Sequence, residues 1–99
     1  MTRFALTPAA TGDLVEIYEV IERDDPKAAK RVLAKLRVAM RRLARTPGLG
    51  HLRGDLADEA LRFWPVYSYL IIYRPETRPL QVIRVVHGAR SLRRLLETE

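Results

Sequence analysis

A chain of 99 residues is long enough for one domain with one hydrophobic core. It has no cysteine, which excludes disulfides, zinc–thiolate sites and a cysteine nucleophile. The first residues lack the apolar stretch of a signal peptide, and no apolar run approaches the roughly 20 residues that span a bilayer. We therefore expect a cytoplasmic protein that takes no cofactor and does not enter a membrane.

Charge is distributed unevenly along the chain. Residues 1–25 carry two arginines and six acidic residues, whereas residues 26–54 contain nine lysines and arginines and no acidic residue. Residues 55–99 are nearly balanced, with seven arginines and six acidic residues. The basic block could bind nucleic acid or an acidic protein partner, or it could be the solvated face of one helix that the acidic helix before it complements. Composition leaves both interpretations open.

The first half of the chain predicts a short strand and two helices. Residues 3–7 alternate as a strand, after which Thr7 can cap a helix whose first residue is Pro8. Asp25 and Pro26 give the same start signal for a second helix, which should run to about residue 45. Only two or three residues join the helices, so they should lie nearly antiparallel. Their apolar stripes are Leu14, Ile17, Tyr18 and Ile21 in the first helix, and Ala29, Val32, Leu33, Leu36, Met40 and Leu43 in the second.

The second half predicts three strands and a last short helix. Residues 46–50 contain a proline and two glycines, which end the second helix, and a polar loop follows. The strands are residues 61–66, where Pro65 indicates a bulge or an edge position, residues 68–73, and residues 80–87. The middle one is continuously apolar, as in a central strand covered on both faces. Gly88 ends the last strand, and Ser91 can cap a helix through residue 96.

This order of elements predicts the fold class α+β, as a single domain over residues 1–99. An N-terminal strand and a helical hairpin should pack on a mostly antiparallel sheet, with a short C-terminal helix. No metal site is expected, because His51 and His87 have neither a histidine at helical spacing nor a cysteine nearby. No phosphate-binding loop is expected either, since the glycines of residues 46–50 lack the lysine of such a motif.

The residues that remain for chemistry are arginines on or beside the strands. A guanidinium group could bind a phosphate or a carboxylate of a target through its planar fork. Alternatively, these arginines could pair with Asp55, Asp58 or Glu59 and fix the loop to the sheet. His87 could act as a general base, or it could be a hydrogen-bonded structural residue at the end of a strand. The arginines in question are Arg62, Arg74, Arg84 and Arg90.

Five segments, in order and over nearly the whole chain, carry a resemblance to a known family. The most specific are Tyr-Leu-Ile-Ile-Tyr-Arg at residues 69–74 and His-Gly-Ala-Arg at residues 87–90, at the end of a predicted strand. With residues 13–18, 28–32 and 43–50, they resemble the ParE branch of the ParE/RelE superfamily of type II toxin–antitoxin toxins. The fold implied by this resemblance, a helical hairpin on an antiparallel sheet, agrees with the predicted one.

The resemblance also implies a choice of target. ParE-like toxins poison DNA gyrase and are neutralised by an antitoxin encoded beside them, whereas RelE-like members are small ribonucleases that cut messenger RNA in the ribosome. No aromatic residue follows residue 90 here, and Lys27, Lys30 and Lys35 all fall in the predicted second helix rather than in a loop. Both features favour ParE. His87 keeps the nuclease alternative open, because some members of the superfamily use a histidine there.

We therefore expect a non-enzymatic toxin that binds DNA gyrase, is held inactive by a ParD-like antitoxin, and reaches operator DNA only through that antitoxin. One alternative is a ribosome-dependent endoribonuclease with Arg62 and Arg84 as phosphate ligands and His87 as acid or base. Another is a degenerate member that only binds its antitoxin and helps to repress their operon.

Two sets of binding residues follow from this interpretation. Arg74, Arg84 and Arg90 are expected to contact the target; within this set, strand alternation favours a surface role for Arg84, and a position just after a turn favours a structural role for Arg90. The antitoxin is expected to bind the hairpin at Leu14, Ile17, Tyr18, Ile21, Leu33, Leu36, Met40, Arg37 and Arg41.

Overall fold

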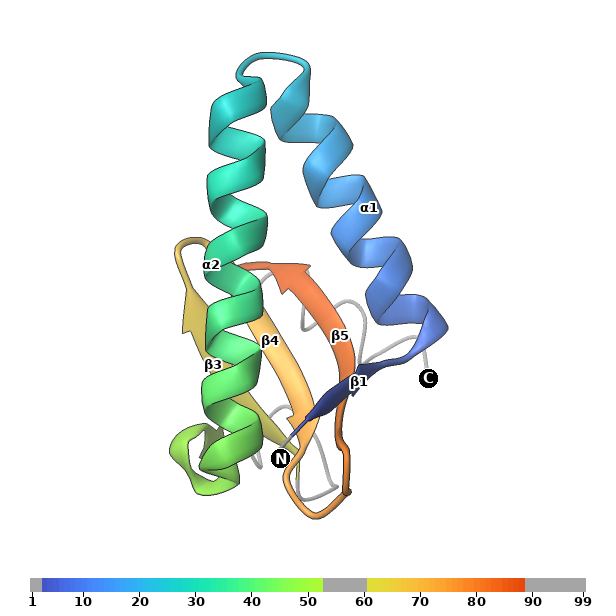
Figure 1. The fold of residues 1–99 in the computed structure, drawn as a ribbon, viewed down its shortest axis with the longest axis vertical. Coiled ribbons are helices and arrows are strands. Elements are labelled where there is room, and N and C mark those ends of the chain that lie inside the picture. Colours follow the sequence, from blue (N-terminus) through green and yellow to red (C-terminus); the bar gives the residue numbers. More distant parts are fainter. Residues whose placement is uncertain (1–2, 53–60, 89–99) are drawn as a thin grey trace.

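The computed structural model describes residues 3–52 and 61–88, and these form two layers (Figure 1). A hairpin of two helices lies across one face of a sheet, and the tip of the hairpin extends beyond it. The predicted α+β class is confirmed, while the expected C-terminal helix falls outside the described residues. The elements are β1 (Phe4–Leu6), α1 (Pro8–Glu22), α2 (Pro26–Arg45), the 3-10 helix η1 (Pro47–Leu49), β2 (His51–Leu52), β3 (Arg62–Val66), β4 (Tyr69–Arg74) and β5 (Leu80–His87).

The sheet has the strand order β1-β5-β4-β3-β2. Its pairs are antiparallel except for β1, which runs parallel to β5. The short β2 was not predicted from the sequence; its two residues pair with β3 only at Arg62 and Phe63. Pro65 lies beyond this pairing, so within the described residues it occupies an edge position, where a missing N–H group costs no ladder bond.

Both helices begin where their capping residues predict. The hydroxyl oxygen of Thr7 accepts the N–H of Ala10 at 3.1 Å, and a carboxylate oxygen of Asp25 accepts the N–H of Ala28 at 3.1 Å. Thr7 also ties the start of α1 to the sheet, because its hydroxyl donates to the carbonyl of Ile83 at 2.8 Å. One residue therefore both starts α1 and positions it against β5.

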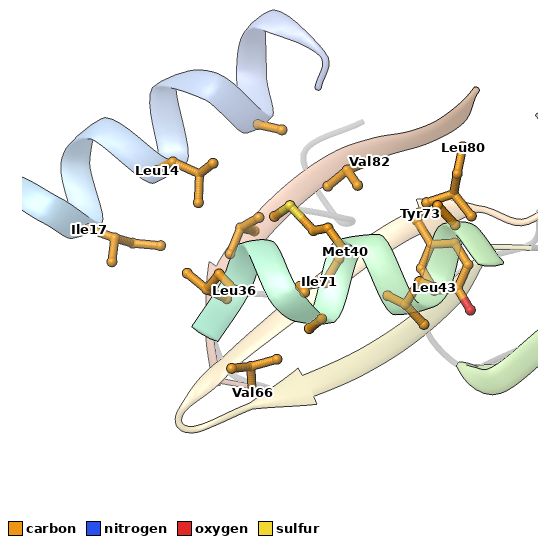
Figure 2. Close-up of a cluster of buried hydrophobic side chains, with 14 residues drawn as sticks. Leu14, Ile17, Leu36, Met40, Leu43, Val66, Ile71, Tyr73, Leu80 and Val82 are labelled. Carbon is orange, nitrogen blue, oxygen red and sulfur yellow. The ribbon is translucent and has the colours of Figure 1, made fainter. Parts of the chain in front are cut away.

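The main core lies between the hairpin and the sheet (Figure 2). Leu36 and Met40 of α2 are fully buried there with Ile71 and Tyr73 of β4. Ile72 lies between these two strand residues and belongs to a second buried cluster, with Leu61, Phe63 and Val86. Successive residues of a strand point to opposite faces, so β4 is covered on both faces, as its apolar sequence predicts.

The turn after α2 is fixed to the sheet by a buried tyrosine. The Tyr73 hydroxyl donates to the carbonyl of Pro47 at 2.6 Å and accepts the N–H of Gly50 at 2.8 Å. Arg62 donates to the carbonyl of Gly50 at 2.7 Å. A Cβ atom on Gly50 would lie 2.5 Å from the Tyr73 hydroxyl oxygen, so only glycine fits. Burial raises the pKa of Tyr73 against the opposing effects of the Gly50 hydrogen bond and the Arg62 charge, which keeps the hydroxyl a donor at neutral pH.

Removing the Tyr73 hydroxyl should destabilise the domain. In Tyr73→Phe, the Pro47 carbonyl and the Gly50 N–H lose their partner inside the protein, which costs about 1–3 kcal/mol. In a domain of this size we expect the melting temperature to fall by at least about 4 °C. Thermal unfolding followed by circular dichroism measures the melting temperature. The matched control is Tyr67→Phe, where the side chain is 59% exposed, with an expected change below about 0.5 kcal/mol. Equal melting of the two variants would contradict the anchoring role.

Candidate functional site

Asp13 of α1 clamps the helix to β5. One carboxylate oxygen accepts the Arg84 Nε–H at 2.7 Å and the backbone N–H of Val85 at 2.9 Å, and the other accepts the Arg84 Nη2–H at 2.9 Å. β1 pairs with β5 only as far as Val82, so the carboxylate satisfies a strand N–H group that lies past the end of β1. The Asp13 side chain is 12% exposed and that of Arg84 is 31% exposed. A fork-on-fork pair of this kind is geometrically specific.

This clamp corrects the surface role expected for Arg84. Arg84 still points opposite to Val85, because it pairs with Ile72 on one face of the sheet while Val85 pairs with Ile71 on the other; the register shift displaces only Ile83. Its guanidinium is engaged because β1 ends at Val82 and Asp13 reaches the edge of β5 beyond that point. Arg84 forms an ion pair with a carboxylate, as the structural alternative held, and among the described residues that carboxylate is Asp13 of α1. Asp55, Asp58 and Glu59 fall outside the described residues.

The three residues of the nuclease alternative do not meet in one place. Arg62 donates to the backbone of the turn after α2, and Arg84 is paired with Asp13. His87 is exposed at the end of β5, where its ring meets that of Tyr69 edge-on at 5.2 Å between centroids. Arg62 is the partner of Tyr73 in the sheet and His87 is the partner of Tyr69, so four residues of β4, about 13 Å, separate them. Of the other expected target contacts, Arg74 is exposed at the end of β4, and Arg90 falls outside the described residues.

The hairpin residues expected to bind the antitoxin divide into two groups. Leu14, Ile17, Leu36 and Met40 are at most 9% exposed and belong to the core between hairpin and sheet, so a partner cannot take them as its main contacts. An apolar stripe on a helix must cover the protein's own sheet before it can serve a partner. The remaining five are more accessible: Tyr18, Ile21 and Leu33 are partly buried, and Arg37 and Arg41 are exposed.

A groove between α1 and β5 was not anticipated from the sequence. Its volume is about 300 Å³, and its floor and walls combine apolar side chains with Glu16 and His87. Val20, which is 52% exposed, forms part of its rim. No local signal in the sequence could reveal it, because the groove joins segments about 70 residues apart. It is lined by Asp13, Glu16, Ile17, Val20, Tyr69, Val85, Val86 and His87.

The outward side of α2 carries eight exposed lysines and arginines. Within residues 3–52 and 61–88, none of its lysines or arginines forms an ion pair, so no ion pair joins α2 to the carboxylates of α1. Arg42 instead places its guanidinium carbon 5.7 Å from the ring centre of Trp64. The basic residues of α2 are Lys27, Lys30, Arg31, Lys35, Arg37, Arg41, Arg42 and Arg45.

Neither a membrane-spanning helix nor a metal-binding cluster occurs in the part of the chain that the structure describes. No helix there is long and apolar enough to cross a membrane. No group of three or more histidine, aspartate or glutamate side chains there is arranged to hold a metal ion.

Comparison with known proteins places the chain in a family. The sequence matches the model of a family described as the ParE toxin of type II toxin–antitoxin system, parDE, over residues 4–92. A solved structure described as the chromosomal ParDE TA system from P. aeruginosa has a similar fold: the TM-score is 0.72 at 17% sequence identity, and the match covers 89% of this chain and 97% of that one. No curated protein sequence matches the chain significantly. Because the family model spans almost the entire chain, the protein belongs to the ParE family of toxins of type II toxin–antitoxin systems.

Proposed function

We propose that this toxin acts in the cytoplasm by poisoning DNA gyrase, without hydrolysing a substrate itself. Membership of the ParE family supports DNA gyrase as the target. The observation that favours gyrase poisoning over RNA cleavage is that both candidate catalytic arginines are bonded to other parts of the fold. Arg62 holds the turn after α2, and Arg84 holds α1 to β5. Neither guanidinium can leave its partners for a phosphate without loosening the fold, and His87 lies away from Arg62.

We further propose that a ParD-like antitoxin binds the hairpin and brings the toxin to operator DNA. The tip of the hairpin extends beyond the sheet (Figure 1), and Tyr18, Ile21 and Leu33 contribute partly buried apolar surface to the two helices. An amphipathic antitoxin helix could cover this surface in the helix-in-groove mode. Its acidic residues would then lie against Arg37 and Arg41, which are exposed. Charge at such a position mainly accelerates association.

The target is tested by incubating the purified toxin with gyrase and supercoiled plasmid DNA, and in parallel with a cell-free translation extract. We expect gyrase-dependent cleaved DNA to accumulate while protein synthesis continues. The matched control for the nuclease alternative is His87→Ala, whose exposed side chain should be dispensable for fold and for gyrase poisoning. Cleavage of messenger RNA at the ribosome that disappears in His87→Ala would overturn the gyrase proposal. Neither activity in a folded sample would support the degenerate alternative.

The antitoxin surface is tested by association kinetics over a salt series. For the double variant R37Q/R41Q, we expect the association rate constant with the cognate antitoxin to fall several-fold at 50 mM NaCl. The salt dependence of the rate should also become shallower. The control R3Q/R23Q removes the same charge from two exposed arginines outside α2 and should change the rate less. A rate constant for R37Q/R41Q that equals that of the control at every salt concentration would exclude this surface.

A further inference from the structure

Six of the eight cations of α2 form two rows on opposite flanks of its outward face, and Lys27 and Arg45 lie midway between the rows. At about 100° per residue, Arg31, Lys35 and Arg42 fall within about 40° of one another around the helix axis. Lys30, Arg37 and Arg41 form the other row, about 120° away. The antitoxin proposal uses only the second row. We call Arg31, Lys35 and Arg42 the strand-side row, because Arg42 lies over Trp64 of β3.

Arg42 places the strand-side row next to two aromatic rings. Its guanidinium lies over Trp64 of β3, and His51 of β2 stacks on the same tryptophan with 6.2 Å between ring centroids and 14° between the ring planes. In Figure 1, β3 and α1 lie on opposite sides of α2, so this row faces away from the other helix. His51 and Arg42 are exposed, and Trp64 is partly buried against the core.

Nothing in the described residues explains this arrangement as a stabilising network. None of the three cations forms an ion pair there, so their charge remains available to an external anion. The contact between Arg42 and Trp64 also holds a cation and a flat ring at a fixed separation on the surface. A row of cations that leads to stacked aromatic rings is the arrangement by which proteins bind single strands: the cations follow the phosphates, and a base stacks on a ring.

We propose that Arg31, Lys35 and Arg42, together with the His51–Trp64 stack, form a binding site for single-stranded nucleic acid. The row spans about 17 Å of helix, a length that can follow several nucleotides. A base would stack on the exposed His51 ring while the backbone runs along the helix. This site goes beyond the proposed gyrase poisoning and does not rest on it.

Two other kinds of partner fit the surface less well. Protein interfaces have an apolar centre from which charged residues are depleted, whereas Val38 is the one large apolar side chain of α2 that is exposed among these cations. A DNA duplex keeps its bases stacked inside the helix, where the His51 ring cannot reach them. A single strand can bind through both features, because its phosphates contact the cations and an unpaired base stacks on the His51 ring.

The test measures binding of fluorescently labelled dT12 and U12 by anisotropy between 50 and 200 mM NaCl, in the absence of gyrase. Three phosphate contacts predict a slope of log affinity against log salt of about −2, a loss of roughly 20-fold over this range. Comparison of dT12 with U12 identifies DNA or RNA as the preferred strand. Trp64 is the single tryptophan of the chain, so its emission should change on binding and report the stack directly.

Variants distinguish binding at this site from non-specific attraction by the net charge of the protein. R31Q/K35Q should bind more weakly, with a slope of about −0.7, and His51→Ala should weaken binding by about fivefold or more and reduce the change in Trp64 emission. The control R3Q/R23Q has the same net charge as R31Q/K35Q and should bind like the wild type. Melting curves verify that each variant folds.

Four results would overturn the proposal. Two concern the strands: no binding of either strand at 50 mM NaCl, or equal weakening in R31Q/K35Q and its control. Two concern other ligands: equally tight binding of a blunt 12-bp duplex without a change in Trp64 emission, or equally tight binding of a 12-residue polyglutamate peptide. The last would instead indicate an acidic protein partner. Because gyrase is absent, none of these results bears on gyrase poisoning, and failure of the gyrase assay would leave the site standing.

Discussion

The hydrogen bonds of Asp13 determine how the helical hairpin sits on the sheet. α1 leaves β1 after a single residue, and β1 pairs with β5 only up to Val82. Beyond that point the edge of β5 would offer unpaired backbone groups beside a helix, where they would be partly shielded from water. The Asp13 carboxylate accepts the Val85 N–H and holds Arg84 in the same contact, so one side chain closes the edge, balances a charge and fixes the position of α1.

The rest of the arrangement follows from that position. With α1 fixed along β5, the short turn before Asp25 directs α2 back across the strands, and its apolar stripe covers Ile71 and Tyr73. The Tyr73 hydroxyl then binds the turn at the far end of α2. The core-facing residues of α2 therefore pack against the sheet, and its cations lie on the outside. The surfaces that we propose for the antitoxin and for a nucleic-acid strand are the two flanks of that outward face.

Local signals in the sequence predicted the elements well, and contacts between distant segments escaped them. Thr7, Pro8, Asp25 and Pro26 set the helix starts because capping depends on neighbouring residues. The Asp13–Arg84 pair joins positions 71 residues apart, so alternation along β5 indicates the face of Arg84 but not its partner in α1. An apolar stripe likewise does not indicate whether the protein's own sheet or a partner covers it. The pattern alone therefore predicts Leu36 and Met40 as antitoxin contacts, although they cover the sheet.

Native-state hydrogen exchange at the Val85 amide tests the role of Asp13 most directly, with the Leu80 amide as reference. Leu80 donates to the carbonyl of Arg3, the residue before β1, and its bond does not involve the clamp. In Asp13→Ala, the free energy of opening at Val85 should fall by about 1–3 kcal/mol more than at Leu80, because Val85 loses its acceptor while the β1–β5 pairing remains. An equal change at the two amides, or unchanged protection of Val85, would contradict the account.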